Sequence, residues 1–303
     1  NRVDPDGPLE PLLRGHLALL SDRFDEAERW YRVLQKPVLG RRNLYQAYEN
    51  LINLALHRGQ FGLARTLLQQ ADASELASEE VLELELEELH CRTLLQTCMA
   101  GKGDDILAEE LNTGKRDLSG LDFSHRQALE YLYGRLYLVK GEIQEVNRMI
   151  TSMKGYVVRR GEAFRRYALH LQAETALQQG QPKEALVFAR QAVDLLPNPG
   201  RPDSLAADFL QTLARIETAL GHLDEAMHLY RDIIDGNIGR LDNATSWVMA
   251  HVELARLCLR NGRKSEAETL AKRVVDWWQK GDPAPQILKE MKGMISGDRL
   301  SGR

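Results

Sequence analysis

GHLDEA, at residues 221–226, is the stretch that decides the fold, because near copies of it recur at a fixed distance. GQPKEA stands at 180–185 and GRKSEA at 262–267, so the final alanines fall at 185, 226 and 267, always 41 residues apart. Each copy follows an apolar run, supplies a glycine and a short polar turn, and opens another helical run. Repetition at a fixed period of this length predicts an array of helical hairpins.

The small residue that opens the second helix can be followed through the whole chain. The seven positions are Ala27, Ala64, Ala108, Val146, Ala185, Ala226 and Ala267. Twelve residues earlier stand Gly15, Ile52, Gln96, Gly134, Ala173, Ala214 and Ala255, of which five are Gly or Ala. Small residues there let two antiparallel helices approach to about 8–10 Å. We therefore expect an all-α solenoid of about seven antiparallel hairpins, with an irregular third hairpin around Gly103 to Asp122.

The turns carry a second signal. Five residues before the small residue, five of the hairpins have glycine, where the first helix must end in a left-handed residue. These glycines are Gly59, Gly141, Gly180, Gly221 and Gly262, and Asp22 takes the same place in the first hairpin. Pro182 falls at the start of a second helix, the helical position that tolerates proline.

The pattern also divides the chain. We expect a linker at residues 1–8, the helical array at 9–280, and a cap helix with a flexible tail at 281–303. The cap would cover the apolar face of the last hairpin, as terminal repeats must. The chain opens at Asn1, not at Met, so we expect it to be a fragment of a longer protein.

The small-residue positions resemble the tetratricopeptide repeat over residues 12–278. The residues that carry the likeness are Gly134, Tyr137 and Gly141, then Ala173, Ala176, Gly180, Ala185, Ala192 and Pro197, then Ala214, Gly221, Ala226 and Tyr230. The spacing exceeds the ~34 residues of that family. The longer period resembles arrays in large bacterial signalling proteins, such as the ATP-binding LuxR-type regulators and kinase-linked arrays. The resemblance implies a right-handed superhelix whose first helices line a concave groove for a protein segment.

That resemblance places the partner-binding residues on the first helix of each hairpin. In chain order they are Gln46, Glu49, Asn53 and His57, then His90, Thr93 and Thr97, then Tyr131 and Arg135, then Tyr167, His170 and Glu174, then Gln211 and Arg215, and finally Arg256 and Arg260. Tyr, His, Arg, Asn and Gln can stack on a peptide or hydrogen-bond its backbone. The alternative is a solvated inner face with no dedicated ligand.

A basic patch, defined as Arg159, Arg160, Arg165 and Arg166, flanks Gly161 between the fourth and fifth hairpins. Arginines in this arrangement suit an acidic or phosphorylated partner segment, because they form bidentate hydrogen bonds. The alternative is an ordinary solvated charged surface.

Composition excludes several functional classes. A net charge of −4 is unlike the basic surface of a general nucleic-acid binder. No apolar stretch approaches the ~20 residues of a membrane span. Three scattered cysteines do not form a disulfide framework, and this favours a reducing compartment, hence the cytoplasm.

The residues show no catalytic or cofactor signature. The eight histidines are spread along the array without HExxH or zinc-finger spacing, so we expect no metal site. GKGDD at 101–105 lacks the spacing of a phosphate-binding loop and is interpreted as a turn. We expect no enzyme activity and no cofactor.

The sequence therefore predicts a protein-interaction scaffold, a module of a larger bacterial signalling or regulatory protein, with self-association allowed. The alternative is a ligand-sensing array that regulates an upstream ATPase or kinase domain.

Overall fold

The structure, a computed structural model, describes residues 7–101, 118–197, 205–282 and 285–296. Within these ranges the chain is all-α and has no strand, which confirms the predicted fold class. No helix in the described ranges is long and apolar enough to cross a membrane.

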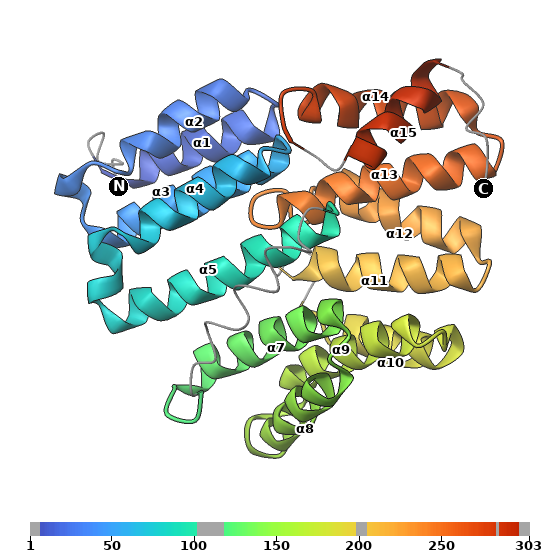
Figure 1. Ribbon diagram of the computed structural model, residues 1–303, viewed down its shortest axis with the longest axis horizontal. Helices are drawn as coiled ribbons and strands as arrows, with labels where there is room; N and C mark the ends of the chain where they lie inside the picture. The colour runs from blue at the N-terminus through green and yellow to red at the C-terminus, as the bar shows by residue number, and fades with distance from the viewer. Residues whose placement is uncertain (1–6, 102–117, 198–204, 283–284, 297–303) are drawn as a thin grey trace.

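The helices follow one another as antiparallel hairpins (Figure 1). In chain order they are α1 (Leu9–Leu20) with α2 (Phe24–Val33), α3 (Arg41–His57) with α4 (Phe61–Asp72), α5 (Glu80–Met99), α7 (Phe123–Lys140) with α8 (Ile143–Arg160), α9 (Arg165–Gln178) with α10 (Pro182–Asp194), α11 (Ala206–Ala219) with α12 (Leu223–Asp235), and α13 (Ala244–Arg260) with α14 (Lys264–Trp278). Short 3-10 helices lie at Pro37–Leu39, Glu75–Ser78 and Glu162–Phe164. The predicted third anchor, Ala108, lies outside the described residues.

The turn residues adopt the backbone that the sequence predicted. Gly59, Gly141, Gly180, Gly221 and Gly262 all have positive φ angles, between 67° and 83°. Asp22 takes the same left-handed conformation with φ 57°. Pro182 is the first residue of α10. The hairpin register read from the sequence is therefore confirmed at these turns.

Small residues allow the helices of a hairpin to approach closely. A Cβ added to Gly15 of α1 would lie only 2.3 Å from the Tyr31 ring of α2. The second-helix anchors in the described ranges are fully buried, among them Ala27, Ala64 and Val146. The buried apolar residues of the array form two core clusters.

A last helix, α15 (Pro285–Ser296), covers the C-terminal end of the array. It packs against α14 and buries Met291 and Met294. Arg256 of α13 binds Glu290 of α15 through two hydrogen bonds, of 2.9 and 2.7 Å. The C-terminal hairpin is thus capped both by apolar contact and by an ion pair.

The array also closes on itself, which the sequence did not predict. In Figure 1 the N-terminal hairpins lie beside the C-terminal ones, and α13 contacts both α3 and α5. A simple solenoid contacts only neighbouring repeats. We call the contacts of residues 19–62 and Gln96 with residues 240–282 the closing seam.

Polar contacts hold the closing seam at three points. Arg240 donates to the backbone oxygens of Leu19 and Leu20, at 3.0 and 3.1 Å, and forms an ion pair with Asp22. The Asn53 side chain accepts from the Ala244 N–H at 3.0 Å and donates to the Arg240 carbonyl at 3.2 Å. The Asp282 carboxylate accepts from the Gly62 N–H at 3.1 Å.

Aromatic rings fill the middle of the closing seam. His57 of α3 is fully buried between Phe24 of α2 and Trp247 of α13, with ring centroids 5.0 and 5.3 Å away. Trp277 of α14 meets the same imidazole edge-on. The first two hairpins and the last one therefore share a hydrophobic core.

Candidate functional site

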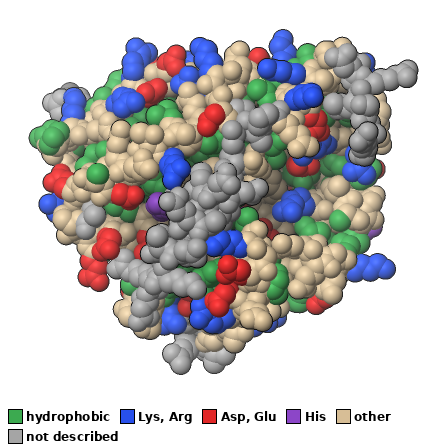
Figure 2. All heavy atoms as spheres, viewed as in Figure 1, with side chains coloured by type: hydrophobic (Ala, Val, Ile, Leu, Met, Phe, Trp, Pro, Cys, Tyr) green, Lys and Arg blue, Asp and Glu red, His purple; other side chains and the backbone are tan. Residues whose placement is uncertain are grey.

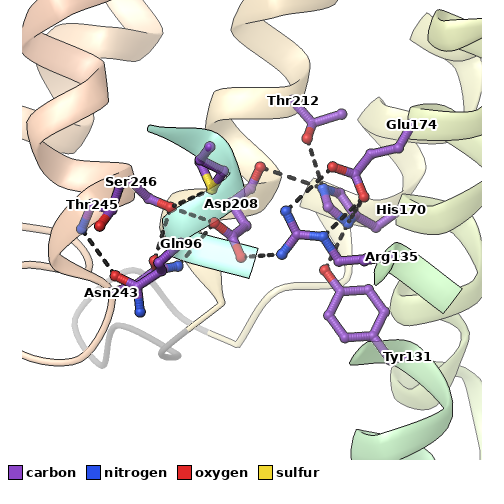
Figure 3. Close-up of polar contacts among 11 residues, drawn as sticks. Gln96, Tyr131, Arg135, His170, Glu174, Asp208, Thr212, Asn243, Thr245 and Ser246 are labelled. Atoms are coloured by element: carbon purple, nitrogen blue, oxygen red, sulfur yellow. Dashed lines mark hydrogen bonds and ion pairs between the residues drawn. The ribbon is translucent and has the colours of Figure 1, made fainter. Parts of the chain in front are cut away.

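The first helices of three successive hairpins bring their charged side chains together on the inner face of the closed array, which we call the ring. Arg135 of α7 lies between Glu174 of α9 and Asp208 of α11 (Figure 3). Its guanidinium donates to both Glu174 oxygens, at 3.0 and 3.3 Å, and to the Asp208 carboxylate. All three side chains are largely buried. Each is one repeat away from the next, so the repeat geometry itself creates the cluster.

His170 extends this cluster on one side. Its Nε2 lies 3.3 Å from the Asp208 carbonyl and 2.9 Å from the Thr212 hydroxyl, and its Nδ1 lies 2.8 Å from the Tyr131 hydroxyl. A carbonyl only accepts hydrogen bonds, so the proton of the neutral ring sits on Nε2 and Nδ1 accepts from Tyr131. The imidazole also stacks on Phe209 at 4.2 Å.

On the other side, Asp208 connects the cluster to α13. Its second oxygen accepts from Ser246 at 2.6 Å and from Asn243 at 2.8 Å. Gln96 of α5 accepts from the Thr245 N–H at 3.0 Å. Every side of the Asp208 carboxylate therefore has a donor, as a buried charge requires.

The ionisation states follow from these contacts. Burial, the largest single effect, would raise the pKa of Glu174 and of Asp208, but the Arg135 charge and the neighbouring cationic and hydrogen-bonding groups together lower both below their ordinary values. Burial lowers the pKa of His170, which stays neutral at pH 7. At neutral pH the cluster holds one positive and two negative charges.

A cavity of about 360 Å³ opens beside the cluster. Its polar lining comes from Arg135, Glu174, Gln178, Gln211, Thr212 and Arg215, and its apolar lining from Leu95, Cys98, Met99, Leu138, Val139 and Leu177. The volume falls within the range of small-ligand sites. A few convergent polar groups on an apolar wall are typical of a binding site.

The comparisons with known proteins agree with this architecture. A family model for the tetratricopeptide repeat matches residues 166–191, in α9 and α10, and 248–273, in α13 and α14. The chain carries tetratricopeptide repeats in these two segments. This confirms the resemblance found in the sequence.

A solved structure shows a similar fold. The chain is similar to a signal transduction ATPase with numerous domains from Pyrococcus horikoshii, which has a tetratricopeptide-repeat sensor. That superposition covers 91% of the chain and 42% of the ATPase, with TM-score 0.50 and 13% identity. The tetratricopeptide domain of P58(IPK) aligns over 95% of the chain and 77% of its own length at 14% identity, but with a TM-score of only 0.26. No curated protein sequence matches the chain.

Four of the predicted groove residues of this tetratricopeptide array line the cavity together. They are Arg135, Glu174, Gln211 and Arg215, from α7, α9 and α11. Arg215 is exposed, whereas Arg135 and Gln211 are buried in its wall. The structure therefore brings these four predicted residues together, and their role in binding stays a prediction.

Other predicted groove residues are buried inside the closed ring, whereas residues that line an open groove are expected to be accessible. The buried groove candidates are Asn53, His57, Thr93, Thr97, Tyr131 and His170. Asn53 and His57 are part of the closing seam, and Tyr131 and His170 belong to the polar cluster. Ring closure covers Asn53 and His57, whereas contacts between successive first helices cover Tyr131 and His170.

The remaining groove candidates lie at the edges of the ring. Glu49 binds Arg92 at 3.0 Å, and His90 lies 3.9 Å from Asp72. Arg256 binds the cap helix, as described above. Gln46 and Tyr167 are half-buried, and Arg260 is exposed.

The basic patch is only partly described. The side chains of Arg159 and Arg160 lie outside the described part of the structure. Arg165 is exposed and pairs with Glu162 at 3.4 Å, while Arg166 donates to the Tyr167 hydroxyl at 2.8 Å. On the face shown in Figure 2, basic and acidic side chains are interspersed. Binding of an acidic segment by this patch stays a prediction.

Sequence reasoning missed the residues that complete the cluster, chiefly Asp208, Asn243 and Ser246. One residue in the sequence did indicate a contact here. Gln96 stands where most repeats have a small residue, and its side chain accepts a hydrogen bond from Thr245 across the seam. Among the described residues, no group of three or more His, Cys, Asp or Glu is placed to hold a metal ion.

Proposed function

We propose that this tetratricopeptide array is a binding module that receives a short segment of a partner protein in the cavity on its inner face. The observation that carries the proposal is the convergence of Arg135, Glu174, Gln211 and Arg215 around one cavity. Three successive repeats supply these groups, which is how such arrays build a recognition surface.

The lining indicates the chemistry of the segment. Leu95, Leu138 and Leu177 offer an apolar wall for one or two hydrophobic side chains. Arg215, the exposed cation at the cavity, suits a carboxylate or a backbone carbonyl of the partner. The closing seam covers the inner face between α3 and α13, so we expect the site to accept a short segment and not a long extended peptide.

The larger setting follows from the same proposal. The array would be a regulatory module of a larger bacterial signalling protein, in which occupancy of the cavity is passed to another domain. The likeness to the sensor-bearing ATPase agrees with this setting through the fold alone.

Selection from a displayed library of random 12-residue peptides tests the function. We expect enriched peptides to bind the wild type and a Lys183→Glu control equally, because Lys183 is exposed on α10 and does not line the cavity. Arg215→Glu should weaken the same peptides by about tenfold or more, since it reverses the cavity charge. Peptides that bind Arg215→Glu as well as the wild type would refute the proposal.

A second function, sensing of a small ligand that regulates an upstream ATPase or kinase domain, is favoured by the closed ring. A ring held by long-range contacts can exist in open and closed states, and a ligand in the cavity would shift their populations. A metabolite library screened by thermal shift tests it, because a ligand at 100 times its Kd stabilises by about 2.7 kcal/mol. The Arg215→Glu variant should abolish such a shift.

A further inference from the structure

One face of α1 is a stripe of exposed leucines. Leu9, Leu13, Leu17 and Leu20 are 52, 54, 60 and 39% exposed. They recur at intervals of four, four and three residues, which places them on one side of the helix. Gly15, which faces Tyr31 of α2, marks the opposite side. We call these four residues the leucine stripe.

The rest of the array shows what this face does elsewhere. Leu13 and Leu17 stand two residues before and after the small residue Gly15. In α7, α9 and α11 the equivalent residues are Leu132 and Leu136, Leu171 and Thr175, and Thr212 and Ile216, all of them buried.

Leu171 shows how these positions are covered, since it packs onto Gly134 of the preceding first helix. The leucine stripe is therefore half of a stacking interface. Terminal repeats of a solenoid ordinarily carry a polar outer face.

The two ends of the array differ. At the C-terminal end, α15 covers the last hairpin and Arg256 ties it in place. A second array that stacked on this chain head to tail would have to displace α15. A contact between two N-terminal ends displaces nothing.

We propose that the leucine stripe is a self-association surface, on which a second copy of this chain packs its own α1 antiparallel across a two-fold axis. The stripe is nearly symmetric about its centre, so Leu13 of one copy meets Leu17 of the other and Leu9 meets Leu20. A two-fold contact of this kind is self-complementary and closes at a dimer.

The charge of this face allows the contact, and the size of the stripe sets its strength. The two charged side chains of α1, Glu10 and Arg14, pair with each other at 2.6 Å, so the face that meets its copy carries no net charge. The stripe is small beside the ~800 Å² that each partner buries in a standard interface. The dimer is accordingly weak and reversible.

Sedimentation velocity of the full chain, from roughly 1 to 500 µM, measures this association, with a Kd expected above about 10 µM. Leu13→Glu/Leu17→Glu should weaken the dimer at least about 30-fold, because it buries four carboxylates in the contact. Val187→Glu is the matched control, since Val187 is 54% exposed on α10, away from the stripe. A wild type that stays monomeric throughout, or a control that weakens the dimer equally, would overturn the proposal.

Disulfide trapping tests the orientation. Two chains, Leu13→Cys and Leu17→Cys, are oxidised by oxidised glutathione, which takes the electrons and protons of the two thiols as the interchain bond forms. We expect a mixture of the two to cross-link faster than either alone, with the wild-type chain giving the background from Cys98. Equal rates would contradict the antiparallel contact.

Discussion

Gly59 shows how much a single residue carries in this fold. It ends α3 in the left-handed conformation, with φ 67°, and an added Cβ would lie 2.8 Å from the Trp278 ring of the closing seam. Gly180 has a similar φ of 74°, but an added Cβ there would meet nothing within 4 Å. Substitutions at these two glycines therefore distinguish the cost of a strained backbone from the cost of a steric conflict.

Gly59→Ala should therefore destabilise the chain more than Gly180→Ala. We expect about 1–2 kcal/mol for Gly180→Ala from the left-handed backbone alone. Gly59→Ala adds overpacking against Trp278, which costs typically a further ~1–3 kcal/mol. Urea unfolding followed by circular dichroism measures both, and equal midpoints for the two variants would contradict this account.

At the scale of the element, the polar cluster between α7, α9 and α11 acts as one unit. Arg135→Ala leaves the Glu174 and Asp208 carboxylates buried with their common cation removed. Breaking a buried ion pair in this way costs about 3–5 kcal/mol.

The control for this prediction is Arg32→Ala. Arg32 pairs with Glu28 four residues away on the exposed face of α2. Such a helical surface pair contributes about 0.3–0.5 kcal/mol. Thermal and urea unfolding of the two variants should show this difference in stability. If Arg135→Ala lowers stability as little as Arg32→Ala, the buried ion pair is not what stabilises the cluster.

Element by element, the sequence was a good guide wherever the contact is local. The turn glycines, Pro182 and the buried Ala185 follow from a pattern that repeats every hairpin, so their neighbours are known in advance. Asp208 carries no such pattern, because its partners Asn243 and Ser246 belong to the next hairpin's irregular entry. Periodicity predicts what repeats and nothing else.

At the scale of the whole molecule, the closing seam is what the sequence could not predict. Arg240 reads as an ordinary loop arginine, yet it binds residues 220 and 221 positions away. Inner-face polar residues such as Asn53 were therefore predicted to be accessible when closure buries them.

Arg240→Ala should loosen the seam without unfolding the hairpins. Hydrogen bonds to a charged group contribute about 1.5–3 kcal/mol each. We expect faster amide exchange in α1 and α13 and a larger radius of gyration by X-ray scattering, with α9 and α10 unchanged. Arg231→Ala, which breaks a 2.6 Å pair with Glu266 between adjacent hairpins, is the control and should not expand the chain.

The seam also predicts sensitivity to acid. Burial lowers the pKa of His57 well below its ordinary value, and that of His251 to about 3, and the nearby cations Arg240 and Arg273 act in the same direction. The unfolded chain binds these protons near pH 6.5 and the folded chain does not, so stability is full above pH 6.5 and falls as the pH drops below it.

His251, with a folded pKa of about 3, should cost about 1.4 kcal/mol per pH unit between pH 6 and 4, and His57 should add to this loss above its own lowered pKa. Unfolding midpoints across this range measure the slope. His57→Phe should reduce the slope, because it removes one group that takes up a proton on unfolding. Equal slopes in His57→Phe and wild type would contradict the assignment. Carboxylates with a lowered pKa, such as Asp208, also stabilise the folded chain, and their contribution is lost only at lower pH.

Ring closure also sets an order of events during synthesis. The first hairpins leave the ribosome with the inner sides of α3 and α5 uncovered, and their partners at residues 240–282 are made more than 140 residues later. Neighbouring hairpins can fold as they emerge, but the joining of the two ends must wait until the chain is nearly complete. A protein built from local repeats thereby acquires a final, long-range folding step, and during that interval its buried aromatic seam is open to solvent.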